Sequence, residues 1–155
     1  MPALTPDETA HLRRAISLAG QTARAGNRPF GAVLTSADGT VLAEGSNTVA
    51  ATGDITAHAE SVALRHAGAE LDLDALRGTT MFASGEPCPM CTTAMYLAGV
   101  TRVIFGMPLP RAHAAFPADE RAMELRTRDV LALLPEPVEV IGPVLEEEAA
   151  AVFGE

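Results

Sequence analysis

Two short runs place three metal-binding side chains and one carboxylate at defined spacings, and this feature constrains the fold most strongly. The first run is His58-Ala-Glu60, and the second is Pro87-Cys-Pro-Met-Cys91. One imidazole and two thiols give a metal ion three protein ligands and leave a fourth position for water. The chain must therefore fold so that two segments distant in sequence meet at one point.

The spacing of the first run predicts its place on a helix. His58 and Glu60 are two positions apart, so in the middle of a helix their side chains would point about 200° apart. At the first turn of a helix, both can reach a metal that lies in front of the helix end. Asp54 or Thr56 can cap that end. We therefore expect this run to open a helix.

The second run also has the spacing and composition of a helix start. Cys88 and Cys91 project on nearly the same side of a helix, and Pro89 suits a first turn. The positive ends of two helices then favour thiolates. Two thiolates cancel the charge of Zn²⁺, so a water molecule bound to the ion is acidified less than in a site made only of histidines. A carboxylate is needed to take the proton, and Glu60 is the candidate.

Each run alone is also compatible with a different kind of site. A lone Cys-x-x-Cys after a strand is typical of a thioredoxin-like redox pair or of half a structural zinc site. A redox pair would leave His58 and Glu60 without a role, and a structural site would need a fourth ligand that no further cysteine supplies. The joint occurrence of both runs favours a catalytic zinc site.

The bulk composition favours one buried core. The 155 residues are 48% hydrophobic, which suffices for a single domain over residues 1–155. No apolar run is long enough to cross a bilayer, and the first residues lack the layout of a secretion signal. We expect a cytoplasmic protein with no membrane partner.

The charge balance limits the classes of chemistry and partner. The net charge is −9 and every basic residue is an arginine, so Schiff-base chemistry and a P-loop are excluded. Acidic residues concentrate toward the C-terminus, ending in Glu146-Glu-Glu148. Such a surface repels a phosphate backbone unless arginines cluster locally. The composition therefore weighs against a nucleic-acid partner.

The hydrophobic periodicity predicts alternating helices and strands. We expect helices over 6–25, 57–67, 90–98, 120–134 and 146–153, and strands over 31–36, 41–49, 79–84, 102–106 and 138–142. The first two strands form a hairpin. The strand, helix and strand over 79–106 predict a right-handed crossover with a parallel pair. Together these elements predict one α/β domain with a mixed sheet between helices.

The stretch over residues 29–106 resembles the cytidine-deaminase-like superfamily, in the branch that holds guanine, fungal-type cytosine and tRNA adenosine deaminases. The matching segments are RPFGAVLTSADGTVLAEGSNTV, DITAHAESVALRHAG and SGEPCPMCTTAMYLAGVTRVIFG. The resemblance implies a three-layer α/β/α fold with a five-stranded mixed sheet. It also implies zinc as the cofactor and a homodimer or larger oligomer with the active site near an interface.

The resemblance implies a role for each residue of the site. It assigns zinc binding to His58, Cys88 and Cys91, proton transfer to Glu60, and substrate contacts to Asn47 and Phe30. From the residues alone, Asn47 is more simply a turn residue that ends the hairpin, and Phe30 is a core residue. The implied reaction replaces an amine on a ring carbon of a nucleobase by an oxo group and releases ammonia.

The choice of substrate depends on segments outside the two runs. Pro-Phe-Gly-Ala-Val and Glu-Pro-Cys-Pro-Met-Cys resemble the guanine deaminases most, and an acidic C-terminal helix disfavours tRNA. Guanine deaminases tend to carry acidic residues after the position of Gly106, where this chain has MPLPRAHAAFPADERAMEL. His113 and Asp119 are the candidates there, and the prolines predict a rearranged loop over the pocket. Guanine or a related aminopurine is the first candidate substrate. The alternatives tRNA adenosine, a nucleoside, cytosine and an aminotriazine stay open.

Overall fold

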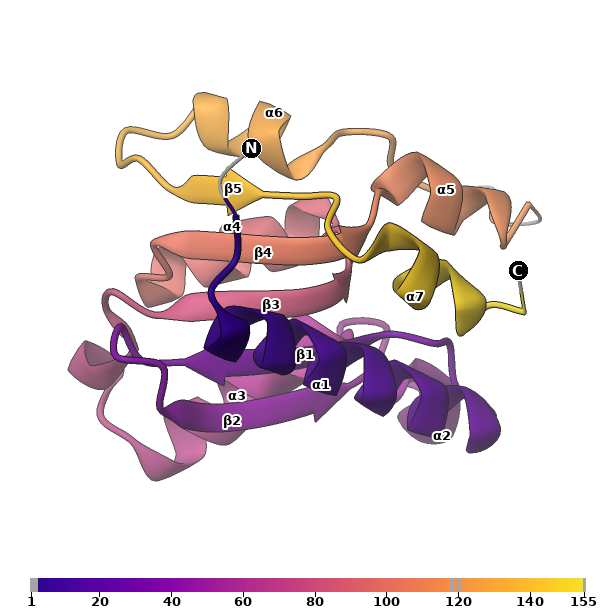
Figure 1. Ribbon diagram of the computed structural model, residues 1–155, viewed down its shortest axis with the longest axis horizontal. Helices are drawn as coiled ribbons and strands as arrows, with labels where there is room; N and C mark the ends of the chain where they lie inside the picture. The colour runs from indigo at the N-terminus through magenta and orange to yellow at the C-terminus, as the bar shows by residue number, and fades with distance from the viewer. Residues whose placement is uncertain (1–2, 118, 120, 155) are drawn as a thin grey trace.

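Five strands form one mixed sheet in the computed structural model, which describes residues 3–117, 119 and 121–154 (Figure 1). The strands are β1 (Gly31–Thr35), β2 (Val41–Ser46), β3 (Thr80–Gly85), β4 (Arg102–Met107) and β5 (Glu139–Ile141). Their order across the sheet is β2-β1-β3-β4-β5. β1 pairs antiparallel with β2 and β3, whereas β3–β4 and β4–β5 pair parallel. The predicted hairpin and the predicted parallel pair are confirmed.

Helices cover both faces of the sheet and make three layers. They are α1 (Pro6–Arg24), α2 (Val49–Thr52), α3 (Ala59–Glu70), α4 (Pro89–Ala98), α5 (Leu109–Ala114), α6 (Thr127–Ala132) and α7 (Glu146–Ala151), with a 3₁₀ turn at Leu73–Leu76. α1 and α7 lie on one face, in front of the sheet in Figure 1, and α3 and α4 lie on the other. The expected α/β/α fold is confirmed. None of the helices in the described ranges combines the length and the apolar character that crossing a bilayer needs.

The strands divide their apolar side chains between two cores. Val33 and Phe82 pack with α1 and α7 on one face of the sheet. Leu34 and Met81, their neighbours along the chain, pack with α3 and α4 on the other face. Because successive side chains of a strand point to opposite faces, β1 and β3 are buried on both sides. This burial holds the strand end that precedes the second metal-binding run in a rigid frame.

α3 approaches β2 closely because Gly45 has no side chain. A Cβ at Gly45 would lie 2.1 Å from the backbone oxygen of Ala59 and 2.5 Å from the backbone nitrogen of Ala63. Close-packed interiors have no room for such an atom. The approach sets the beginning of α3, and with it His58 and Glu60, against the sheet.

The structure corrects the helix expected over 120–134. α6 begins only at Thr127, residues 121–126 form no helix, and residue 120 lies outside the described residues. Arg126 is extended, with φ −81° and ψ 157°. The helix begins where it does because the carboxylate of Glu86 accepts the N–H of Thr127, which satisfies a donor that a helix start leaves unpaired.

Several other boundaries shift by one to three residues, and two of these shifts have a clear cause. The helix expected over 57–67 runs on to Glu70 through Gly68, since a helix tolerates one glycine at modest cost. The strand expected over 41–49 ends at Ser46, and α2 follows. It ends there because the Oδ1 of Asn47 accepts the N–H of Val49 in a tight turn.

Candidate metal centre

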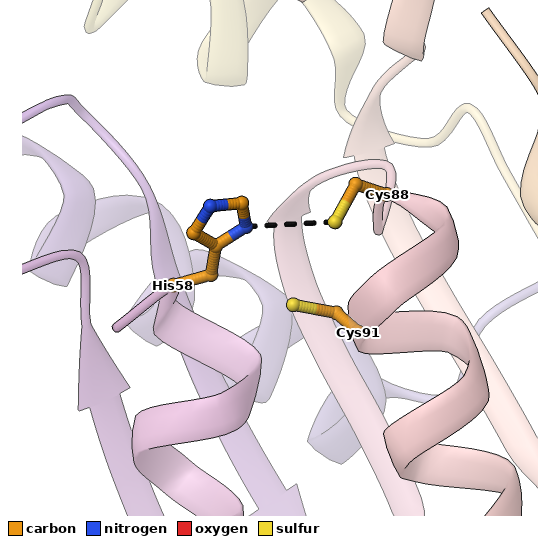
Figure 2. Close-up of side chains that lie close together, drawn as sticks. All are labelled: His58, Cys88 and Cys91. Atoms are coloured by element: carbon orange, nitrogen blue, oxygen red, sulfur yellow. Dashed lines mark hydrogen bonds between the residues drawn. The ribbon is translucent and has the colours of Figure 1, made fainter. Parts of the chain in front are cut away.

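His58, Cys88 and Cys91 bring three metal-binding atoms to one place (Figure 2). Their ligand atoms all lie within 4.8 Å of one another, and the Nδ1 of His58 lies 3.5 Å from the Sγ of Cys88. His58 is the N-cap of α3. Cys88 is the N-cap of α4, and Cys91 lies in its first turn. Both predicted helix starts are confirmed.

The local backbone leaves these side chains free to meet. Both N-cap residues are extended, with ψ 157° at His58 and 168° at Cys88, and neither side chain caps its own helix. Each can therefore point toward the other run, as Figure 2 shows. The cap expected from Asp54 or Thr56 is wrong. The Oδ1 of Asp54 instead accepts hydrogen bonds from the backbone N–H and the hydroxyl of Thr56.

The two thiols ionise differently. A hydrogen bond with Cys91, together with one to His58, lowers the pKa of Cys88 to about 4. The same bond to Cys88, with burial, raises the pKa of Cys91, and the bond to Cys88 raises the pKa of His58. Cys88 is thus a ready thiolate. An imidazole with two thiols is a donor set that suits zinc, so the residues present fit this ion.

Glu60 is a buried carboxyl group beside the cluster. It is 5% exposed and lines the same cavity as His58 and Cys88. Burial, with the negative charge of Cys88, raises the pKa of Glu60 to about 6. A carboxyl group with a pKa near neutrality can both accept and return a proton.

A cavity of about 760 Å³ lies in front of the cluster. Most residues that the sequence singled out line this cavity: Phe30, Asn47, His58, Glu60, Cys88, His113 and Asp119. Cys91 is fully buried and reaches the site through its contact with Cys88. The volume is in the range of about 300–1,000 Å³ that is typical of small-molecule sites.

Asn47 combines a turn role with a position at the cavity. Its Oδ1 accepts the N–H of Val49 at 3.1 Å, which is the turn role. It is also 4% exposed and lines the cavity. Because the oxygen is occupied by the turn, the amide NH₂ group is the part of Asn47 that is left to face a ligand.

An aromatic cluster forms one side of the cavity. The ring of Phe30 lies 6.4 Å from that of Phe116 and 5.5 Å from that of Phe153, between ring centroids. Phe30 also packs against both hydrophobic cores. Phe30 is therefore a core residue that lines the cavity as well.

Arg28, Phe116 and Glu86 are among the cavity residues that the sequence analysis did not single out. Arg28 forms two hydrogen bonds to Asp119, at 2.6 and 2.7 Å, and its guanidinium lies 4.1 Å from the centroid of Phe116. No spacing rule joins residues 28 and 119. Glu86 stands directly before the run Pro87-Cys-Pro-Met-Cys91, and this position is the one local signal in the sequence that points to a cavity residue among the three.

A three-layer fold in which His, Cys-x-x-Cys and a buried Glu meet at two helix starts defines the class of zinc-dependent deaminases. The family model for the cytidine and deoxycytidylate deaminase zinc-binding region matches residues 5–107. This chain belongs to that family.

Named relatives in the family act on different substrates. The chain is 32% identical to the "Probable cytosine deaminase" of Schizosaccharomyces pombe, covering 94% of this chain and 90% of that protein. It is 31% identical to the tRNA-specific adenosine deaminase of Bacillus subtilis, covering 97% and 88%. The solved structure of guanine deaminase from Bacillus subtilis is 39% identical over 69% of this chain and 68% of that chain, with a TM-score of 0.63. The family therefore establishes a deaminase without specifying the substrate.

Proposed function

We propose that this protein hydrolytically deaminates a small nucleobase or nucleoside, with guanine or a related aminopurine as the first candidate. The observation that carries the proposal is the burial of Glu60 beside three metal-binding atoms at one cavity. A buried carboxylate of this kind has little structural use, whereas proton transfer in a deaminase requires one.

The proposed mechanism assigns each polar group a task. His58, Cys88 and Cys91 would hold zinc, which would supply the activation of a water molecule for attack on the amine-bearing ring carbon. Glu60 accepts a proton from the attacking water and passes it to the ring nitrogen, and it then transfers the second proton, from the newly attached hydroxyl group, to the leaving amine. A carbon–oxygen bond forms, the carbon–nitrogen bond breaks, and ammonia leaves.

Asn47 and Phe30 orient the base in this proposal. The turn occupies the Oδ1 of Asn47, so its NH₂ group donates to a carbonyl oxygen or a ring nitrogen of the substrate. Phe30 provides an apolar face on which a flat ring can pack. Guanine offers both a carbonyl oxygen and ring-nitrogen acceptors, as well as the amine that the reaction removes.

Two observations favour a small substrate over tRNA. The chain has a net charge of −9. The acidic C-terminal helix α7 uses Glu146, Glu147 and Glu148 in ion pairs with Arg111 and Arg13, so these arginines are not available for phosphates. The tRNA-specific relative keeps tRNA adenosine as the second candidate. The relative named for cytosine keeps cytosine, and with it aminotriazines, as the third.

The proposal includes a homodimer and a cytoplasmic location. The resemblance to oligomeric deaminases supports the first. The second agrees with two thiols that must stay reduced to bind a metal.

A substrate screen tests the proposal. Zinc-loaded protein is incubated with guanine, adenine, cytosine, their nucleosides and aminotriazines, and ammonia release is measured. Release from guanine or another aminopurine supports the first candidate, and release only from cytosine or an aminotriazine selects the third. Steeply salt-dependent tRNA binding with deamination of its adenosine selects the second. No release from any of these substrates would contradict the proposed function.

A further inference from the structure

Glu86 joins both ends of one side of the cavity to the metal-binding turn. This side, here named the outer wall, is residues 109–126, of which 118 and 120 are outside the described part. Leu109, Ala112, His113, Phe116, Asp119 and residues 121–123 of the wall line the cavity. The Oε1 of Glu86 accepts the N–H of Leu109 at 2.9 Å, and its Oε2 accepts the N–H of Thr127 at 3.1 Å. The wall thus begins and ends on one carboxylate, two residues before Cys88.

The carboxylate is buried and its charge is balanced. The side chain of Glu86 is 1% exposed, and the Nε of Arg126 donates to its Oε1 at 2.7 Å. Three N–H donors therefore occupy the two oxygens. Because a buried carboxylate with these partners is held in one orientation, the positions of Leu109 and Thr127 are set relative to the turn that carries Cys88.

A second set of bonds ties the same turn to the same wall end. The hydroxyl of Thr127 donates to the carbonyl oxygen of Pro87 at 2.9 Å. The backbone N–H of Glu86 donates to the carbonyl oxygen of Met107 at 2.8 Å. These bonds hold together the ends of β3 and β4, the two strands that lead into the site, at the point where the outer wall begins.

Between its ends the wall is held by apolar packing of Ala112 and Phe116 and by ion pairs. Arg111 pairs with Glu146 and Glu147 of α7, and Asp119 pairs with Arg28. The Arg28–Asp119 pair is exposed on both sides, where such pairs contribute little, whereas the Arg111–Glu146 pair is half-buried. Residues 121–125 are all exposed. The bonds to Glu86 therefore fix the two ends of the wall, on either side of its exposed stretch at 121–125.

We propose that Glu86 is a positioning residue that sets the outer wall against the metal-binding turn and so determines the shape of the cavity. It acts through hydrogen bonds to Leu109, Arg126 and Thr127 rather than by transferring protons. The effect on catalysis rests on the proposed function, whereas the effect on the wall does not.

Amide hydrogen exchange on the zinc-loaded protein tests the proposal. Glu86→Gln keeps the shape of the side chain, but it removes the charge and turns an NH₂ group toward N–H donors. Peptides covering 109–127 are expected to exchange about ten- to hundredfold faster, because their hydrogen bonds to a charged acceptor are lost. Peptides of α1 and β1 keep their rates, and the zinc content stays at one per chain.

Two further variants test whether the faster exchange arises from the hydrogen bonds of Glu86. Arg126→Gln leaves Glu86 in place and is expected to speed exchange around residues 126–130 more than around 109–114. Glu44→Gln is the matched control, because Glu44 also forms two hydrogen bonds to an arginine, Arg14, but lies on β2. It leaves exchange over 109–127 unchanged.

Kinetics separate positioning from a merely structural role. On a substrate found by the ammonia screen, Glu86→Gln raises KM about tenfold, since the wall is misplaced, and changes kcat much less. The proposal is overturned if exchange over 109–127 stays at the wild-type rate in both Glu86→Gln and Arg126→Gln. It is also overturned if both variants lose zinc and exchange faster along the whole chain. Absence of any substrate would contradict the proposed function and leave the exchange result intact.

Discussion

The Nδ1 of His58 and the Sγ of Cys88 approach to 3.5 Å, although the two residues belong to different helices on one face of the sheet. Each is an N-cap residue whose side chain is not used by its own helix. The contact exists because α3 and α4 both begin at the same end of the sheet. Two helix starts thus supply ligands and positive dipole ends to one metal position.

Removal of one ligand should remove the zinc. We expect Cys91→Ser to lower the zinc content from one per chain to near zero, because the fully buried thiol is one of the three grouped ligand atoms and a serine hydroxyl is not among the usual zinc ligands. At a thousandfold excess of zinc over its Kd, the ion contributes about 4 kcal/mol to the free energy of unfolding. Metal analysis and thermal unfolding measure both effects. Thr93→Ala, an exposed position of α4, keeps the zinc. Full zinc content in Cys91→Ser would show that Cys91 is not a ligand.

Asn47 should affect substrate binding more than the fold. Asn47→Asp keeps the oxygen that accepts the N–H of Val49 but replaces the NH₂ donor by an acceptor. We expect kcat/KM to fall about ten- to hundredfold, which is the loss of one hydrogen bond from a buried site. Zinc content and the melting temperature stay near wild type. Unchanged kinetics would leave Asn47 with the turn role alone.

The Arg28–Asp119 pair should matter for the cavity and little for stability. Both side chains are more than a third exposed, so Arg28→Gln is expected to change the free energy of unfolding by less than about 1 kcal/mol. The same variant uncovers Phe116, on whose ring Arg28 lies, and is expected to raise KM. Denaturant unfolding and steady-state kinetics measure the two effects. A large loss of stability with an unchanged KM would contradict a role for this pair at the cavity.

The pH dependence of the Arg28–Asp119 contribution follows from the pKa of its carboxyl group. The hydrogen bond from Arg28 lowers the pKa of Asp119 from its ordinary value of 3.8. The pair therefore contributes fully above that value, and the contribution is lost as the pH falls through the lower pKa of the folded state. Wild type and Arg28→Gln should converge in stability only at such acidic pH.

Gly45 offers a test of how α3 is placed. We expect Gly45→Ala to destabilise the protein by at least about 2 kcal/mol, since overpacking a filled interior costs about 1–3 kcal/mol and the new Cβ would meet backbone atoms of α3. Gly68→Ala is the matched control. Gly68 lies in α3 itself, with nothing within 4 Å of the new Cβ, and the substitution should stabilise by about 0.5–1 kcal/mol. Equal effects at the two positions would contradict the close approach of α3 to β2.

The sequence was sufficient where local signals decide the structure. Thr5 and Glu8 form the capping box expected at the start of α1. The spacing of His58 with Glu60, and of Cys88 with Cys91, required two helix starts, and both are present. The turn between the first two strands and the strand, helix and strand over 79–106 also predicted the mixed sheet, because a short turn gives an antiparallel pair and a helical crossover gives a parallel one.

The sequence was insufficient where distant side chains decide the structure. The apolar periodicity over 120–134 favoured a helix, but the carboxylate of Glu86 accepts the N–H of Thr127 and delays the helix start. The pairing of Arg28 with Asp119 joins segments that no periodicity relates. In each contact one partner, Asp119 or Thr127, lies beyond the matched family region at residues 5–107.

The central claim is that Glu60 moves protons at a zinc site, and Glu60→Gln with metal analysis tests it most directly. The substitution keeps the size of the buried side chain and removes its basicity. Ammonia release from the best substrate of the screen is predicted to fall about 10²–10⁴-fold, with zinc at one per chain. Glu70→Gln, exposed at the end of α3, retains full activity. Activity of Glu60→Gln near the wild-type level, with zinc bound, would contradict proton transfer by Glu60.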